Sequence, residues 1–447
     1  MEANINMETL LEEAAKMITT FYTSQRDDER QQAHQWLLQL QQSNHAWQVA
    51  CTLTKSGGTF EMQYYGCNIL HYKVSKHWSD VVDNMNELKG MFKELLIKFC
   101  QGPKVIRTKL CLAFAAFIIQ AAEEDWNLGS LLQEVESWIK EQNLDSKEIT
   151  LELLASLPSE MKSLHLAKSR RQLVYGIFRA FIPKLLDMSQ AVLQNSNEPT
   201  SCKGDVLKCL SIWVQFGVTL SEMEGMVSFL FSKIGEPDLS DQICEVLIEL
   251  ITSPSSYNCS IMILNFMKLA LSLDSLVYQS INNKDNDMIN NLCLLFTSIG
   301  ETHCRLFVKS NNSEYQTALL NYVKILLHFT AIKGYHPVDE TCSEQTFTFW
   351  YTLQDDITSL EPHEVTDFHH SLNEVYMALI QILCKKVQYP PDDVYNQFDS
   401  DEKERFRCYR IDIQDTIMYV YNLVQEKCIQ YLADHLHHLL SGMWLYF

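Results

Sequence analysis

The sequence predicts an all-α protein built from stacked helical hairpins, and three observations lead to this prediction. The chain has 447 residues, which is more than one ordinary hydrophobic core holds, because such cores stop growing near about 250–300 residues. Glycine and proline number only 14 and 10, whereas an all-β protein of this size needs many more turns. Apolar residues recur with the period of an α-helix along most of the chain.

The first predicted helix shows this period clearly. Its apolar residues recur at the i, i+4, i+7, i+8, i+11 spacing of one helix face: Leu10, Ala14, Met17, Ile18 and Phe21. A polar break over residues 23–28 follows, and a second helix is marked by apolar residues between Ala33 and Leu40.

Four more helices are predicted before residue 125. One ends at Ser56-Gly-Gly, the next covers Phe60–Trp78, and a further apolar face runs over Met85–Phe99. The last covers Pro103–Ala122, since proline is favoured in the first turn of a helix.

The alternation of helix and short break continues to the C-terminus. Breaks are predicted at Leu157-Pro158, Asn195–Ser201, Gly235–Pro237, Ser253-Pro254, Asn282–Asn286, Ser310–Ser313, Gly334–Pro337, Glu361-Pro362 and Tyr389–Pro391. Their spacing suits helical hairpins of about 40–47 residues, the period of HEAT repeats. Such units cannot bury their apolar faces alone and must stack on their neighbours. The predicted fold is therefore a continuous HEAT-repeat α-solenoid, a superhelical arch of about ten helical hairpins.

The charge balance limits the classes of partner. Lys and Arg total 36 against 56 Asp and Glu, which gives a net charge of −20. A negative field repels nucleic acid and anionic membranes and attracts basic proteins, although it can also serve only to keep a large protein soluble. With no basic stripe in the chain, direct nucleic-acid binding is not expected. The longest uncharged apolar stretch, over residues 110–122, is shorter than the about 20 residues that cross a bilayer, so no membrane span is expected.

The cysteines indicate a reducing compartment. All 14 are scattered, without a C-x-x-C pair, and most stand among apolar residues, as Cys111 and Cys293 do. Free cysteine in such surroundings behaves as a small buried hydrophobe. Because no signal peptide opens the chain, we expect a soluble intracellular protein.

The sequence contains no catalytic constellation. Walker A, dinucleotide-binding, G-x-S-x-G and H-E-x-x-H motifs are absent, so neither enzymatic activity nor a cofactor is predicted. Cys428, His435 and His438 could share one face of a helix. Solvated histidines explain this spacing more simply than a metal site does, and no metal is predicted.

The stretch Cys408–Val424 has the composition of a binding surface. One side of the predicted helix is an apolar stripe: Ile413, Ile417, Val420 and Val424. The opposite side carries Asp412, Asp415 and Tyr419. Aromatic residues are enriched at binding surfaces, although Asp alone is not. An exposed face without any partner would show the same spacing.

Several motifs resemble those of a known family. Two long segments are the most specific: Phe347–Leu360 with its flanks, and Tyr395–Val424. Three shorter ones lie upstream: QYYGCNILHYK at Gln63–Lys73, GPKVIRTKLCLAF at Gly102–Phe114 and LELLASLP at Leu151–Pro158. Together they resemble the β-karyopherins, the nuclear transport receptors, in their importin-13/transportin-SR branch, over about residues 44–440.

This resemblance implies a receptor that shuttles between cytoplasm and nucleus. Its implied partners are the GTP-bound form of the GTPase Ran, folded protein cargo with a basic surface, and the phenylalanine–glycine repeat proteins of the nuclear pore. The implied regions are N-terminal HEAT repeats with Ran-binding residues over 1–125, an exportin-1-like region over 100–250, and further HEAT repeats with an acidic cargo-facing wall over 251–447. The alternative is a helical-repeat scaffold that binds proteins without control by Ran.

The resemblance also points to candidate residues. In the family, Ran lies against the first repeats, which here are the helices Phe60–Trp78 and Pro103–Ala122. The residues of these helices that avoid the main apolar stripe are Glu61, Tyr64, Asn68, His71, Lys104, Arg107 and Cys111; packing between repeats would select the same positions. The candidates for cargo binding are Asp355, Asp356, Asp412, Asp415 and Tyr419.

Family members are considerably longer than this chain. We therefore expect it to correspond to their N-terminal half, to be truncated at its C-terminus and to transport cargo weakly if at all, since transport needs Ran binding and cargo release to be coupled. Cargo identity and the direction of transport do not follow from the sequence.

Overall fold

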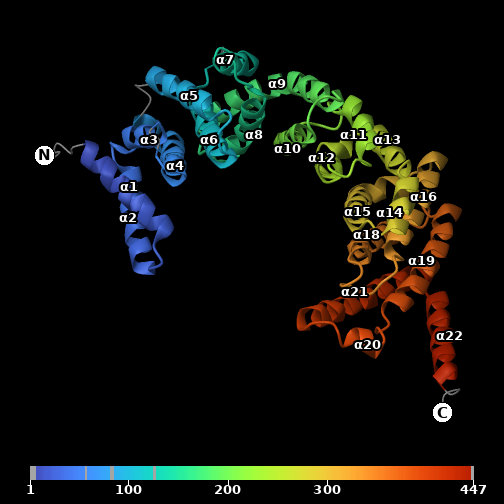
Figure 1. The fold of residues 1–447 in the computed structure, drawn as a ribbon. Helices are drawn as coiled ribbons and strands as arrows, with labels where there is room; N and C mark the ends of the chain where they lie inside the picture. Colours follow the sequence, from blue (N-terminus) through green and yellow to red (C-terminus); the bar gives the residue numbers. More distant parts are fainter. Residues whose placement is uncertain (1–6, 56–57, 81–84, 124–126, 444–447) are drawn as a thin grey trace. The chain divides into compact units, whose positions relative to one another are not determined.

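A computed structural model describes residues 7–55, 58–80, 85–123 and 127–443. All regular elements within these ranges are α-helices or short 3-10 helices (Figure 1). Contacts divide the chain into two compact units, Met1–Phe216 and Gly217–Phe447, which are described separately below. The boundary between them lies within the predicted exportin-1-like region.

The first unit consists of ten α-helices in its described residues: α1 (Met7–Thr23), α2 (Asp27–Gln42), α3 (Ala46–Lys55), α4 (Phe60–Lys76), α5 (Met85–Phe99), α6 (Lys104–Ala121), α7 (Leu128–Lys140), α8 (Lys147–Ser163), α9 (Lys168–Gln194) and α10 (Thr200–Phe216). A 3-10 turn at Trp78–Asp80 follows α4. From α3 on, the helices alternate between two layers. In one layer α4, α6, α8 and α10 each pack on the next, and in the other α3, α5, α7 and α9 do the same.

The second unit repeats this arrangement. Its described helices are α11 (Glu224–Lys233), α12 (Ser240–Thr252), α13 (Ser260–Leu271), α14 (Asp274–Asn283), α15 (Asn286–Val308), α16 (Ser313–Thr330), α17 (Cys342–Gln345), α18 (Phe347–Thr358), α19 (Asp367–Lys386), α20 (Asp392–Tyr395), α21 (Ser400–Val424) and α22 (Glu426–Met443). One layer contains α12, α15, α18 and α21, and the other contains α11, α13, α16 and α19. Helices stacked in sequential pairs confirm the predicted all-α fold and are consistent with a HEAT solenoid.

Close contact between neighbouring helices depends on glycine at two positions. A Cβ atom on Gly300 of α15 would lie 2.5 Å from Cδ2 of Phe349 of α18. A Cβ atom on Gly66 of α4 would lie 2.9 Å from the carbonyl oxygen of Ala50 of α3. Both distances are too short for a real side chain, so glycine sets the approach of successive helices in each unit.

Residues 260–283 are long and apolar enough, by length and composition, to cross a membrane. They form two consecutive helices, α13 and α14, rather than one. These helices pack on α15 and α16, and core helices often have such a composition. Packing within the stack buries 39% of the most apolar part of this stretch.

Most predicted breaks coincide with loops, but the break at Leu157-Pro158 is wrong. Pro158 lies inside α8. Proline at this position leaves the carbonyl of Leu154 without its helical partner, which normally costs a helix several kcal/mol. Here the indole Nε1–H of Trp213, on α10, donates a hydrogen bond of 2.9 Å to that oxygen. The contact between α8 and α10 thus satisfies the group that Pro158 leaves free, and the helix continues.

Replacement of Trp213 by Phe tests this explanation. Trp213→Phe keeps an aromatic ring but removes the donor, so we expect the free energy of unfolding of the chain to fall by about 1–3 kcal/mol, as for a buried carbonyl left unsatisfied. In the same background, Pro158→Ala restores a backbone N–H and should recover part of the loss. Urea unfolding followed by circular dichroism measures both effects; no recovery by Pro158→Ala would contradict the proposed role of Trp213.

Candidate functional site

An acidic and aromatic patch forms where α18 packs on α21. We call it the acidic–aromatic surface; its members are Tyr351, Asp355, Asp412, Asp415 and Tyr419. The rings of Tyr351 and Tyr419 lie 4.9 Å apart between centroids, at 55°, and Tyr351 is 45% exposed. The structure therefore brings three of the five predicted cargo residues, Asp412, Asp415 and Tyr419, together with Tyr351, which the sequence analysis missed. The fourth, Asp355, is exposed one turn after Tyr351 on α18.

The electrostatics of this surface favour a cationic ligand. Partial burial and the nearby Asp415 raise the pKa of Asp412. Partial burial also raises the pKa of Tyr419, with further contributions from Asp415, Tyr351 and Asp412. When acidic groups lie this close together, each makes the ionised form of the others less favourable. A positive charge beside them offsets this repulsion. A lysine or arginine side chain beside the two rings would supply that charge together with cation–π contact.

The fifth predicted residue, Asp356, does not face outward as expected. It is only 7% exposed, whereas Asp355 is exposed, because successive residues of a helix point about 100° apart. Burial raises the pKa of Asp356 to about 6, although Arg305 of α15 and Lys309, directly after this helix, oppose the shift. Asp356 thus lies at the contact between α15 and α18.

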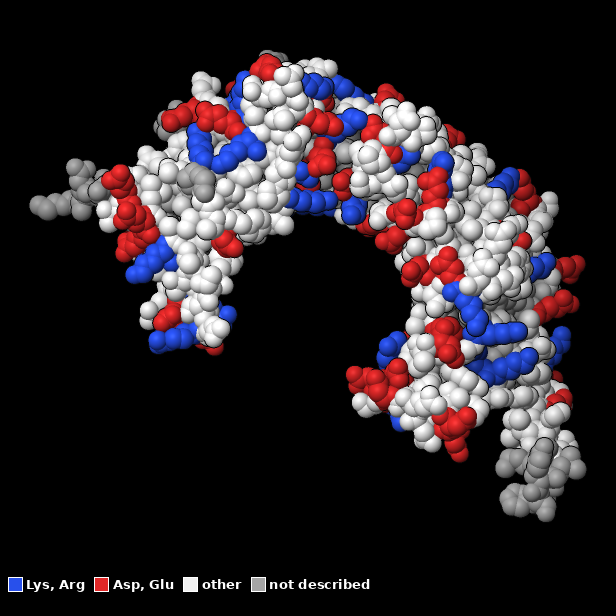
Figure 2. Space-filling view, in the orientation of Figure 1, with Lys and Arg blue, Asp and Glu red and all other residues white. Residues whose placement is uncertain are grey.

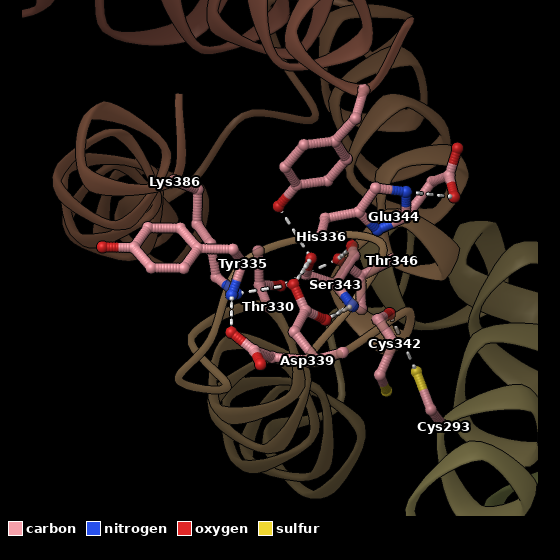
Figure 3. Close-up of polar contacts among 12 residues, drawn as sticks. Cys293, Thr330, Tyr335, His336, Asp339, Cys342, Ser343, Glu344, Thr346 and Lys386 are labelled. Carbon is pink, nitrogen blue, oxygen red and sulfur yellow. Dashed lines mark hydrogen bonds and ion pairs between the residues drawn. The ribbon is translucent and has the colours of Figure 1, made fainter. Parts of the chain in front are cut away.

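A buried polar network holds α21 in position (Figure 3). It starts in the loop between α16 and α17, where Glu340 pairs with Lys386 of α19 at 2.6 Å. Glu340 also accepts hydrogen bonds from the backbone N–H of Ser343, at 2.9 Å, and from its hydroxyl, at 2.7 Å. The Ser343 oxygen lies 2.7 Å from the hydroxyl of Tyr409, one turn before Asp412 on α21. Three helices and one loop are therefore joined through a single carboxylate.

His336 extends this network toward the surface. Its ring stacks on Tyr409 with centroids 4.3 Å apart, and its Nε2 lies 3.4 Å from Oε2 of Glu344. Burial lowers the pKa of His336 and raises that of Glu344, to which Asp412 also contributes. The network thus couples electrostatically to the acidic–aromatic surface. Nothing in the spacing of these residues along the sequence indicates that they meet.

In the first unit, two of the predicted Ran-binding residues lie in an aromatic patch between α1 and α4. Tyr64 and Phe60 have parallel rings with centroids 6.3 Å apart. Burial raises the pKa of Tyr22 on α1, and Tyr64 and Glu61 raise it further. We call Tyr22, Phe60, Glu61 and Tyr64 the N-terminal aromatic surface. Asn68 is half-buried, one turn further along α4.

His71 and Lys104 already have partners within the unit. Nε2 of His71 lies 2.9 Å from Oε1 of Glu160 on α8, and Nζ of Lys104 lies 3.2 Å from Oδ1 of Asp205 on α10. Both pairs link helices of the same layer. A ligand that used either residue would have to replace an existing contact.

The predicted outward orientation of Arg107 and Cys111 is wrong. Arg107 is only 6% exposed; its NH2 lies 2.7 Å from Oε2 of Glu148 on α8, and its NH1 donates to the carbonyl of Cys100 at 3.2 Å. Cys111 is fully buried. The helical period identified one buried stripe on α6, but α4 and α8 cover this helix from two sides.

An apolar groove lies between α11 and α13 of the second unit. It has a volume of about 350 Å³. Its apolar walls are formed by Leu220, Val227, Met262, Phe266 and Leu269, and Glu224 and Lys268 also line it. A groove of this composition suits one aromatic or branched aliphatic side chain of a ligand.

The three residues considered for a metal lie on one helix, α22, but differ in exposure. Cys428 is buried and packs within the unit, whereas His438 is exposed. His435 instead stacks on Tyr431, with centroids 5.9 Å apart. Among the residues that the structure describes, no group of three or more His, Cys, Asp or Glu side chains has metal-binding geometry.

The position of Asp356 generates a prediction about pH. Its pKa is raised on folding, so the folded state binds the proton more tightly, and this carboxyl lowers stability as pH rises from about 4 toward 6. Asp356→Asn should therefore raise the free energy of unfolding at pH 7 by about 1–2 kcal/mol and leave it nearly unchanged at pH 4. Urea titrations at both pH values measure this. Asp355→Asn, at the exposed neighbour, should change stability by less than half as much, and equal effects would contradict the assignment.

Comparisons with known proteins agree with this fold and with the motifs. A family model described as exportin 1-like protein matches residues 103–247. A model of the second TPR domain of transportin-3 and importin-13 matches residues 284–386, and an importin 13 repeat model matches residues 388–427.

Relatives of known identity extend the match over almost the entire chain. Importin-13 of Mus musculus is 32% identical over 438 residues, which are 97% of this chain and 45% of that protein. Importin-13 of Homo sapiens is 31% identical over the same shares, and transportin MOS14 of Arabidopsis thaliana is 25% identical over 90% of this chain and 42% of that protein.

A solved structure supports the fold. The structure named importin13 cytosolic state superposes with a TM-score of 0.72 at 23% identity, over 86% of this chain and 44% of that one. The chain thus spans about 45% of the length of the curated relatives it matches. The expectation of a protein without catalytic activity agrees with these matches, because karyopherins are not enzymes. The resemblance seen in the motifs is confirmed: the chain is a homologue of about the N-terminal 45% of importin-13, with exportin 1-like and transportin-3/importin-13 domains.

Proposed function

We propose that the chain acts as a nuclear transport receptor of the importin-13 type, which binds Ran in its GTP-bound form and a folded cargo protein with a basic surface. The observation that carries this proposal is the match to importin-13 over 97% of the chain, together with the exportin-1-like region at 103–247. In this role the chain shuttles between cytoplasm and nucleus.

For Ran, we propose the region 1–125 and, within it, the N-terminal aromatic surface. Glu61 and Tyr64 are the predicted residues that remain half-exposed beside other aromatic side chains. Asn68 follows on the same helix. His71 and Lys104 would take part only by exchanging their partners Glu160 and Asp205, and Arg107 would act indirectly, by holding α6 against α8.

For cargo, we propose the acidic–aromatic surface within region 251–447. Its carboxylates suit the basic side chains of a folded protein, and its two tyrosines supply rigid contact area. Asp and Glu side chains also gather at the N-terminal end of α21 (Figure 2), where Asp399, Asp401, Glu402 and Glu404 lie. Glu404 already pairs with Arg407, so the other three carboxylates would extend the attraction of basic cargo along the same helix.

For the nuclear pore proteins, we propose the apolar groove between α11 and α13. Its size suits the phenylalanine side chain of a phenylalanine–glycine repeat. The groove lies on the layer of the second unit that does not contain α18 and α21, so the same unit offers separate surfaces for cargo and for pore proteins.

Binding of Ran tests the central claim. The purified chain should bind Ran loaded with a non-hydrolysable GTP analogue and not the GDP form, as measured by surface plasmon resonance. Tyr64→Ala should weaken this binding by about tenfold, as expected for an aromatic residue at the centre of an interface. Tyr257→Ala, at a tyrosine of the second unit that is 60% exposed, is the matched control and should have no effect. Equal binding of both nucleotide forms by a folded chain would support the Ran-independent scaffold instead.

Salt-dependent binding tests the cargo surface. A labelled folded basic protein should bind the chain more weakly as salt is raised, because attraction between exposed charges is screened. Asp415→Asn combined with Tyr419→Ala should reduce its affinity by about tenfold, whereas Asp434→Asn, an exposed carboxylate of α22, should change it by less than about twofold. If both variants weaken binding equally, only the overall charge of the chain attracts basic proteins.

A further inference from the structure

A groove between α3 and α5 of the first unit is not used by the proposed function. It has a volume of about 450 Å³. From α3 it is lined by Trp47, Gln48, Cys51 and Lys55, and from α5 by Glu87, Gly90, Met91 and Glu94. It lies in the layer opposite to α4 and α6, which carry the candidate Ran-binding residues.

The floor of the groove is open above Gly90. A Cβ atom built on this glycine would meet no atom within 4 Å. The Cys51 thiol is half-buried here, and its burial, supported by the charges of Glu87 and Glu94, raises its pKa to about 12. The thiol therefore stays neutral near pH 7 and is neither a nucleophile nor a soft-metal ligand.

The walls carry more negative than positive charge. Nζ of Lys55 lies 2.5 Å from Oε2 of Glu94, and Lys98 donates instead to the last carbonyls of α3, those of Thr54 and Lys55. Glu87 is exposed and has no ion-pair partner among the residues that the structure describes. In the same part of the chain, no ammonium group lies over the Trp47 ring.

The neighbouring contact, between α5 and α7, shows how this combination of groups is satisfied. Trp138 of α7 stands between Glu134 and Glu141. Lys89 of α5 reaches Glu134 at 2.9 Å and lies 5.8 Å from the Trp138 ring centroid. Lys93 approaches Glu141 at 3.8 Å and the same ring at 5.7 Å. In this repeat, the chain's own lysines thus occupy the site beside a tryptophan with flanking carboxylates.

We propose that the groove between α3 and α5 binds a lysine or arginine side chain of an extended basic segment in a partner protein. The cation lies over Trp47 and pairs with Glu87, as Lys89 does with Trp138 and Glu134, and Gly90 leaves room for the aliphatic stem. The site is independent of Ran and of the acidic–aromatic surface. Charge complementarity favours this partner, because Glu87 and the indole face are both unmatched within the described chain.

The test uses the 447-residue chain and a short fluorescein-labelled peptide of alternating lysine and serine, with fluorescence anisotropy as the readout. Glu87→Gln should weaken binding by about fivefold, as expected for the loss of one ion contact beside a cation–π contact. Glu13→Gln removes the same charge from an exposed position of α1 and should leave binding unchanged. Acetylation of the peptide lysines should abolish binding.

Gly90→Leu is the decisive variant because it removes no charge. Its side chain fills the groove, and leucine is a better helix former than glycine, so the melting temperature should stay the same or rise while peptide binding is lost. Equal weakening by Glu87→Gln and Glu13→Gln, or unchanged binding in Gly90→Leu, would overturn the proposal. The proposal would also be overturned if the chain forms dimers in sedimentation experiments and Gly90→Leu makes it monomeric without changing peptide binding. A second copy of the chain would then occupy the groove.

Discussion

Each helix of this protein is covered only by its neighbours in the stack, and this constraint determines the rest of the structure. In α6, which lies between α4 and α8, the consecutive residues Phe114, Ala115 and Ala116 are all fully buried. Burial on more than one side requires close approach, which the chain achieves with small residues such as Gly66 and Gly300 at the contact points. It also means that a polar group inside a layer must find its partner on its own helix, as Thr54 does, or on the next one.

The polar contacts inside the stack follow this rule and link one repeat to the next. Trp213 satisfies the Leu154 carbonyl that Pro158 leaves free, Arg107 joins α6 to Glu148 of α8, and Lys386 joins α19 to Glu340. Breaking one member of a buried pair such as Lys386–Glu340 is costly because the other is left uncompensated. These contacts therefore fix the rotation of each helix about its axis. In the second unit, that rotation brings Tyr351 of α18 against Tyr419 of α21.

The sequence predicts what depends on neighbours along the chain and misses what depends on neighbours in space. Helical period and polar breaks locate most helices, and long motifs identify the family, because both are local signals. The period shows only one stripe per helix, so it gave Arg107 and Asp356 an outward orientation although a second helix covers each of them. Leu157-Pro158 reads as a break because the donor that compensates for it, Trp213, is far away in the sequence. The network of Glu340, Ser343 and Tyr409 has no spacing signal, since its members come from a loop, from the short helix α17 and from a helix more than fifty residues later.

A repeated geometry also explains why surfaces differ in function although the helices that form them are alike. The grooves between successive helices of one layer have the same construction, and side chains alone decide what each can hold. Between α5 and α7 the chain supplies its own lysines to Trp138. Between α3 and α5 a comparable set of groups stays partly unmatched. Between α11 and α13 most of the lining residues are apolar. Packing within the stack already satisfies the polar groups of the interior. A surface groove whose side chains find no partner within the chain therefore lowers the stability of the fold only slightly. Binding specificity can therefore differ from one groove to the next while the stack that carries them is preserved.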